Sequence, residues 1–222
     1  MSKIVHPYAH RLIILRDWRS RWFALPKQYR SFLKGDVLVR EYLEKKLRGM
    51  YISAIEIERN QKTTRFIIKT SRPGLIIGRN GEGATKLKTD ILKKMESLKL
   101  PKPEDFKLEI VEITNPEADA AIVAFMIAEG LEKRMPYRRV IKQVLEKVMQ
   151  AQGVQGARVV LGGRLGGAEI ARTEELKRGS IPLQTFRADI DFKRERANLA
   201  YGVIGIKVWI YRGKIFAEKK AK

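Results

Sequence analysis

The chain contains no cysteine in 222 residues and only two histidines, at positions 6 and 10. The absence of cysteine excludes disulfide bonds, thiolate nucleophiles and cysteine-based zinc sites. His6 and His10 have a spacing that can suit a metal pair, but Pro7 lies between them and no third ligand stands nearby. We therefore expect no metal site.

Long apolar segments and targeting signals are also missing. The longest apolar run is nine residues, from Ala120 to Ala128, whereas a helix that crosses a bilayer needs about 20. The first residues contain no apolar segment of the kind found in a signal peptide. We expect no membrane partner, and a cytoplasmic or otherwise reducing compartment.

Catalytic and nucleotide-binding motifs are equally scarce. The glycine-rich stretch from Gly78 to Lys86 has the spacing of neither a P-loop nor a dinucleotide fingerprint. Asp189 and Asp191 alternate on one predicted strand and could imitate a two-carboxylate nuclease site, but we favour outward polar positions or arginine partners. We expect no enzymatic activity, no cofactor and no small-molecule substrate.

Positive charge is abundant. The chain has 46 Lys and Arg against 25 Asp and Glu, a formal net charge of +21, and a sequence pI near 10.2. Such an excess repels itself in a compact fold, which points to a polyanionic partner. Among the first 35 residues, cations are interleaved with Trp18, Trp22 and Phe23, a mixture that suits nucleic acid, although the rings could instead close the edge of a core.

Residues 27–115 read as one α+β domain. An apolar repeat of about 3.6 residues predicts a helix over 27–47, and alternating apolar residues predict a hairpin of strands around 55–58 and 65–69. A second helix begins near Glu82 and is stopped by Pro101 and Pro103. Phe106, Leu108 and Ile110 alternate with charged residues in a third strand.

Residues 116–212 read as a second α+β domain. Asn115-Pro116 marks a boundary and a helix start, and helices are predicted over 117–133 and 136–152. Strands are predicted at 158–161, 186–192 and 201–211, which gives two helices on an antiparallel sheet. A basic extension (1–26) and a short basic tail (213–222) complete the predicted organisation.

A Gly-x-x-Gly loop is the most informative local motif, and it consists of Gly78, Arg79, Asn80 and Gly81. It follows an apolar pair and lies between the hairpin and the third strand, the setting of a KH domain, which clamps about four nucleotides of RNA. The glycines let phosphates approach the backbone, and Arg79 adds a cation. The helix-first order matches the type II KH fold. The alternative is an ordinary turn between helices.

The chain resembles the universal KH-domain family of the small ribosomal subunit, in its bacterial or organellar form. The resemblance covers nearly the whole length and has its longest matches in the second half. The matching segments are His6-Pro7 with Arg11-Leu12, Trp18 to Ala24, Ile57-Glu58-Arg59, Thr70 to Gly74, the Gly78–Gly81 loop, Gly163 to Glu174, Arg187 to Asp191 and Tyr201 to Ile210.

The resemblance implies a place in the head of the small subunit, with small-subunit ribosomal RNA and neighbouring head proteins as partners. It also implies that messenger RNA is contacted and unwound where it enters the subunit, by Arg138, Arg139 and Lys142. On a helix these three side chains span an arc of about 100°, away from the apolar face. The alternative is a solvated charged face, and Gln143 stands where relatives often carry another cation.

A ribosomal RNA site is predicted around the bend formed by Gly163, Gly166 and Gly167, where the backbone can approach a partner. The alternative is a hairpin with ordinary surface cations. Arg11 and Arg72 join the expected set through the resemblance. The complete set is Arg11, Arg72, Arg164, Arg172, Lys177, Arg178 and Arg187. The other function that the sequence leaves open is an extra-ribosomal KH-type RNA-binding assembly or transcription factor.

Overall fold

The structure is a computed structural model that describes residues 5–60, 63–98 and 105–216. The chain divides into two compact units: residues 18–114 form one, and residues up to 17 join residues from 115 onward in the other. The predicted extension is thus shared between the two units. Pro101, Pro103 and residues 217–222 of the predicted tail lie outside the described residues, and the predicted domain limits remain predictions.

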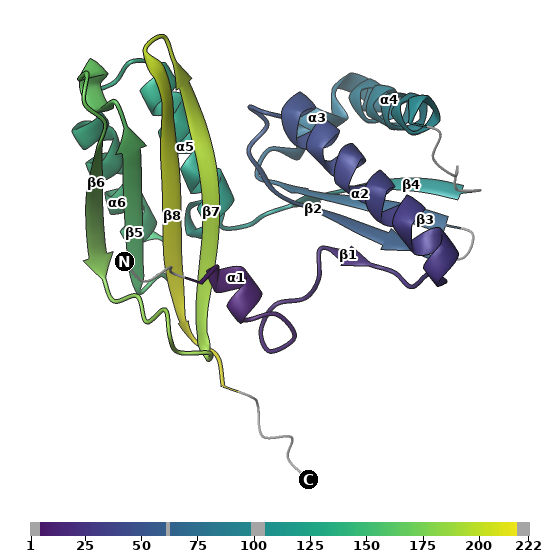
Figure 1. The fold of residues 1–222 in the computed structure, drawn as a ribbon, viewed down its shortest axis with the longest axis horizontal. Helices are drawn as coiled ribbons and strands as arrows, with labels where there is room; N and C mark the ends of the chain where they lie inside the picture. The colour runs from purple at the N-terminus through teal and green to yellow at the C-terminus, as the bar shows by residue number, and fades with distance from the viewer. Residues whose placement is uncertain (1–4, 61–62, 99–104, 217–222) are drawn as a thin grey trace. The chain divides into compact units, whose positions relative to one another are not determined.

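The unit of residues 18–114 has the helix-first order predicted for a type II KH domain. Its β1-β2-β3-β4 sheet pairs β2 with β3 antiparallel and β3 with β4 parallel, while β1 runs parallel to β2 (Figure 1). The elements are β1 (Ser20–Arg21), α2 (Pro26–Lys46), β2 (Ile52–Arg59), β3 (Thr63–Thr70), α3 (Pro73–Ile77), the 3-10 turn η1 (Arg79–Gly81), α4 (Glu82–Ser97) and β4 (Asp105–Glu112).

Apolar periodicity explains this unit. Proline at the first position of α2 suits a helix start, because its missing N–H would be unpaired there anyway. Helix α4 buries Leu87, Ile91 and Met95, which lie four residues apart on one stripe. They pack with Ile57 of β2 and Phe66 of β3 in one core between the helices and one face of the sheet. The predicted helices and the predicted hairpin are confirmed.

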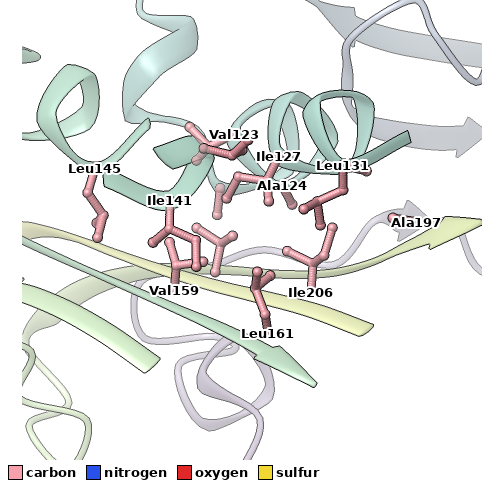
Figure 2. Close-up of a cluster of buried hydrophobic side chains, with 14 of the residues drawn as sticks. Val123, Ala124, Ile127, Leu131, Ile141, Leu145, Val159, Leu161, Ala197 and Ile206 are labelled. Atoms are coloured by element: carbon pink, nitrogen blue, oxygen red, sulfur yellow. The ribbon is translucent and has the colours of Figure 1, made fainter. Parts of the chain in front are cut away.

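The second unit places α5 (Ala120–Glu132) and α6 (Tyr137–Gln150) on one face of an antiparallel β6-β5-β8-β7 sheet (Figure 1). Figure 2 shows side chains of α5 and α6 meeting those of the strands, among them Ile127, Ile141, Val159 and Ile206. The remaining elements are α1 (Pro7–His10), the 3-10 turns η2 (Pro116–Ala118) and η3 (Leu165–Gly167), and the strands β5 (Gly156–Gly163), β6 (Arg172–Gly179), β7 (Ala188–Leu199) and β8 (Gly202–Lys214).

Two details of this unit differ from the sequence prediction. The predicted helix start at 117 is wrong, because Asp119 caps α5 instead: its carboxylate accepts hydrogen bonds from the N–H groups of Ala121 (2.9 Å) and Ile122 (3.3 Å). Strand β6 was not predicted, because only Leu176 among its mostly charged residues packs against the core. No helix in the described part of the chain is long and apolar enough to cross a bilayer.

Candidate nucleic-acid interface

The Gly78–Gly81 loop joins α3 to α4 through three residues with positive φ. Gly78, Asn80 and Gly81 have φ of 70°, 50° and 77°, values that glycine adopts without strain and that asparagine tolerates better than most residues. Gly78, Arg79 and Asn80 are exposed, and Gly81 is partly exposed. The backbone of the loop is therefore open to a partner.

Gly83 has a role in this loop that the sequence analysis missed. A Cβ atom at Gly83 would lie 2.5 Å from the carbonyl oxygen of Ile76 and 2.9 Å from that of Ile77, distances that no side chain tolerates. Glycine here lets the first turn of α4 lie against the end of α3. The available signal was a third glycine two residues after the Gly-x-x-Gly motif.

The surroundings of the loop suit a sugar–phosphate chain with unstacked bases. The first turn of the 16-residue helix α4 presents N–H groups and the positive end of the helix dipole. Leu75 and Ile77 of α3 are 54% and 38% exposed, which offers apolar surface to bases. Arg72, at the start of α3, is exposed with its guanidinium 4.4 Å from the centroid of the Tyr51 ring.

Helix α6 presents Arg138, Arg139 and Lys142 to solvent on the side away from its buried apolar face. Arg138 lies 3.3 Å from a carboxylate oxygen of Glu174, and the hydroxyl of Tyr137 donates to the same oxygen at 2.8 Å. These hydrogen bonds, that from Tyr137 first, lower the pKa of Glu174, and the bond to Glu174 raises the pKa of Arg138.

Within the described residues, Arg139 and Lys142 have no carboxylate within ion-pair distance. Arg138 therefore shares its charge with Glu174, while Arg139 and Lys142 are available to phosphates. Sequence reasoning did not identify Glu174 as a local counter-ion, because it is far from Arg138 in sequence and reaches it from β6.

The glycine bend of residues 163–167 is anchored from inside the unit. Leu165 is 1% exposed and joins the core beneath α5 and α6. Arg164 donates from Nε to the carbonyl of Ala168 (2.9 Å) and from Nη1 to that of Tyr201 (3.2 Å). Arg164 thus braces the bend, and its half-buried guanidinium offers less to a partner than the sequence suggested.

The other cations predicted around this bend do not form one cluster. Adjacent residues of a strand point to opposite faces, so Arg178 lies on the helix-bearing side of β6, where it contacts Glu146 at 3.1 Å, and Lys177 lies on the opposite side. Arg172 is exposed at the start of β6. Arg187 is exposed just before β7, 5.8 Å from the Phe216 ring centroid.

Arg11 lies inside the second unit, with 0% of its surface exposed. Its guanidinium donates to the carbonyls of Ala188 (2.6 Å), Leu183 (2.9 Å) and Thr185 (3.0 Å). Burial lowers the pKa of Arg11, and the nearby Asp189 carboxylate counters that effect. Arg11 therefore ties the N-terminal segment to the chain before β7, and we do not place it among the residues that touch RNA.

The histidines and the aspartate pair also have structural surroundings. His6 lies edge-on to Phe192 and His10 stacks on Phe186, so the two rings face different neighbours. Asp189 pairs with Arg16 at 2.5 Å, and Asp191 with Arg212 at 3.1 Å, which confirms the predicted arginine partners. In residues 5–60, 63–98 and 105–216, no group of three or more His, Cys, Asp or Glu side chains could hold a metal ion.

Comparison with known proteins agrees with this architecture. Residues 38–118 match the KH domain model, and residues 127–210 match the model of ribosomal protein S3, C-terminal domain. The chain is 46% identical over 215 residues to small ribosomal subunit protein uS3 of Maridesulfovibrio salexigens, with 97% of each chain covered.

Two further relatives match over at least 96% of both chains. The chain is 45% identical over 221 residues to the uS3 of Caldicellulosiruptor bescii (100% of this chain, 96% of the relative). It is 42% identical over 214 residues to the protein named uS3c of Guillardia theta (96% of each). Since both halves match in order and over their full length, the chain belongs to the uS3 family of small ribosomal subunit proteins.

Proposed function

We propose that the chain is a structural constituent of the small ribosomal subunit that binds small-subunit ribosomal RNA and neighbouring ribosomal proteins, and that it acts in the ribosome without catalysing a reaction. The observation that carries the proposal is full-length similarity to uS3 proteins at 40–46% identity, together with a net charge of +21. A polyanionic partner of large size accounts for that charge.

Two exposed surfaces support contact with RNA. The Gly78–Gly81 loop offers open backbone, the start of α4 and the exposed Arg79 side chain, the features that a KH loop uses to hold RNA. The exposed face of α6 offers Arg139 and Lys142 beside Arg138. We propose that this face lies at the messenger RNA entrance and helps to open structured messages, and that Arg72, Arg172, Lys177, Arg178 and Arg187 contact ribosomal RNA.

Sedimentation of a cell lysate tests membership of the subunit. The chain should travel with small subunits and leave them only at high salt, because phosphate contacts weaken steeply as counterions are added. A chain that stays in the ribosome-free fractions at low salt would instead support the extra-ribosomal RNA-binding factor.

Translation of paired messages tests the α6 face. We expect the triple variant Arg138→Ala, Arg139→Ala, Lys142→Ala to slow elongation through a stable hairpin several-fold and to leave an unstructured message unaffected. The matched control removes three exposed lysines from other helices, Lys34→Ala, Lys45→Ala and Lys93→Ala. Equal slowing in both variants, or normal passage through the hairpin in the first, would refute the role of α6.

A further inference from the structure

The C-terminal sheet has one face without helices, and part of that face is open. Residues of β8 alternate: Ile206 and Val208 point into the core beneath α5 and α6, so Lys207 and Trp209 point to the opposite side. Around Trp209 this helix-free face is covered by apolar packing with Ile181 and Leu183. In Figure 1, α1 lies at one end of β7.

Beyond this cover, cations gather on the helix-free face. Lys207 of β8 is the register partner of Arg194 of β7, and both side chains are exposed. Arg196 follows on the same face of β7, and Lys177 lies on the same face of β6. We call Lys177, Arg194 and Lys207 the sheet-face patch.

Among the described residues, Lys177, Arg194 and Lys207 have no carboxylate within ion-pair distance. Strand alternation places a single carboxylate on this face in the described strands, that of Glu175, and it already contacts Arg158 at 2.6 Å. Like charges directly opposite each other on neighbouring strands are destabilising, and Arg194 faces Lys207 in that way. No described carboxylate offsets the repulsion between Arg194 and Lys207. This arrangement points to an anion provided by a partner molecule.

Beside the patch, two neighbouring glycines leave part of the sheet backbone without side chains, and we call this part the glycine floor. Gly162 of β5 and Gly205 of β8 are register partners, and Gly205 is also the register partner of Arg196. A Cβ atom at Gly205 would come no closer than 3.7 Å to another atom, and one at Gly162 no closer than 3.6 Å, both ordinary contacts. The chain itself has room for side chains at both positions, although glycine weakens a strand. Their absence suits the close approach of another backbone.

We propose that the helix-free face of the β6-β5-β8-β7 sheet is a docking surface for the sugar–phosphate backbone of RNA. The patch cations hold phosphates, and the glycine floor lets the backbone lie close to the sheet. The inference rests on the proposed function, because it assumes an RNA partner, and it adds residues of β7 and β8 that sequence reasoning did not select. An acidic protein segment would fit the charge but does not need the glycine floor.

The test compares full-length variants in binding to transcribed small-subunit ribosomal RNA over a series of salt concentrations. Arg194→Gln with Lys207→Gln should reduce the slope of log K against log salt by about 1.5, which is about 30-fold weaker binding at 0.1 M salt if the curves meet at 1 M. The control, Lys34→Gln with Lys45→Gln, removes two exposed charges from α2 and should change the slope far less.

A second variant tests the glycine floor without altering charge. Gly205→Val should leave the thermal midpoint equal or higher, because valine suits a strand and space is present, yet it should weaken RNA binding about tenfold. Unchanged RNA binding by Gly205→Val would overturn the assignment of the floor.

The outcomes separate this inference from the proposed function. If the wild-type chain binds ribosomal RNA no better than heparin, the proposed function itself fails. If the wild-type chain binds RNA well and the Arg194/Lys207 variant keeps its full slope, the docking surface alone is refuted. Full RNA binding by that variant with lost binding to poly-glutamate would assign the face to an acidic protein instead.

Discussion

The two sheets of this protein carry charge on their helix-free faces in opposite ways. In the KH unit the cations are paired across strands: Arg21 contacts Glu56 at 3.0 Å, Lys69 contacts the same Glu56 at 2.5 Å, and Arg65 contacts Glu109 at 3.0 Å. In the C-terminal unit, Arg194 and Lys207 face each other with no described carboxylate beside them.

The contrast shows why net charge alone does not locate an RNA-binding surface. A cation held by a neighbouring carboxylate contributes little to the attraction of a phosphate, because the pair is already close to neutral. A polyanion therefore gains the most binding energy where cations have no carboxylate beside them. In the KH unit we therefore place RNA at the glycine loop, and in the C-terminal unit at α6 and at the open sheet face.

The largest expected effect comes from the buried pair of the KH unit. Asp36 is 1% exposed and accepts hydrogen bonds from Arg59 Nε (3.0 Å) and Trp22 Nε1 (2.7 Å). Asp36→Ala would leave the Arg59 charge buried and unpaired, so we expect the free energy of unfolding of this unit to fall by about 4 kcal/mol. Calorimetry should show a lower transition for one unit only. An equal loss of stability in the other unit would contradict the assignment of this pair to the KH unit alone.

The corresponding variant in the second unit is Arg11→Met. It removes the donors to the carbonyls of Ala188, Leu183 and Thr185, which lie in a buried setting, and we expect a loss of about 3 kcal/mol. Native-state hydrogen exchange should report faster exchange in β7 and β8 and unchanged exchange in β2 and β3. Arg139→Met, on an exposed side chain, serves as the control and should change neither.

A third variant removes one carboxylate charge from the ion-paired sheet face of the KH unit. Glu56→Gln releases Lys69 and one contact of Arg21, so the slope of RNA binding against salt should steepen by about 0.7. Glu41→Gln on α2 makes the same change in net charge without releasing a described ion pair. Equal steepening by the two variants would mean that net charge, and not pairing, decides RNA affinity.

The smallest expected effect is a pH dependence at α6. Because the pKa of Glu174 is lowered in the fold, its contribution to stability is present above the ordinary glutamate value and is lost as the pH falls through the lowered pKa. Acid titration followed by NMR should show the Glu174 carboxylate titrating below a typical glutamate. Tyr137→Phe should move that pKa back toward its usual value, and no shift would contradict the Tyr137 hydrogen bond as its cause.

Much of the fold follows from local sequence patterns, and the failures have physical reasons. The stripes of α4 and α6 and the alternation of Ala188, Ile190 and Phe192 predict their elements, since each buries an apolar face. Strand β6 lies at an edge and buries little, so its sequence carries almost no periodic signal. The start of α5 is fixed by the capping side chain of Asp119. The nearby Asn115-Pro116 pair predicts an earlier start, so the sequence alone favours the wrong residue.

The candidate site was less predictable, because it depends on contacts between distant residues. The Gly-x-x-Gly motif identified its loop, since the required backbone angles are local. The burial of Arg11 and the opposite directions of Lys177 and Arg178 depend on tertiary packing and strand register. Arg194 and Lys207 are recognised as neighbours only once the pairing of β7 with β8 is known.

The most direct test is a map of protein–RNA crosslinks in assembled small subunits that contain this chain. We expect crosslinks at the Gly78–Gly81 loop, on α6 around Arg139, and on the helix-free face around Arg194 and Lys207. We expect few on the KH sheet face around Glu56 and Lys69. Crosslinks concentrated on that ion-paired KH face, with none on the C-terminal sheet, would refute this assignment of the RNA-binding surfaces.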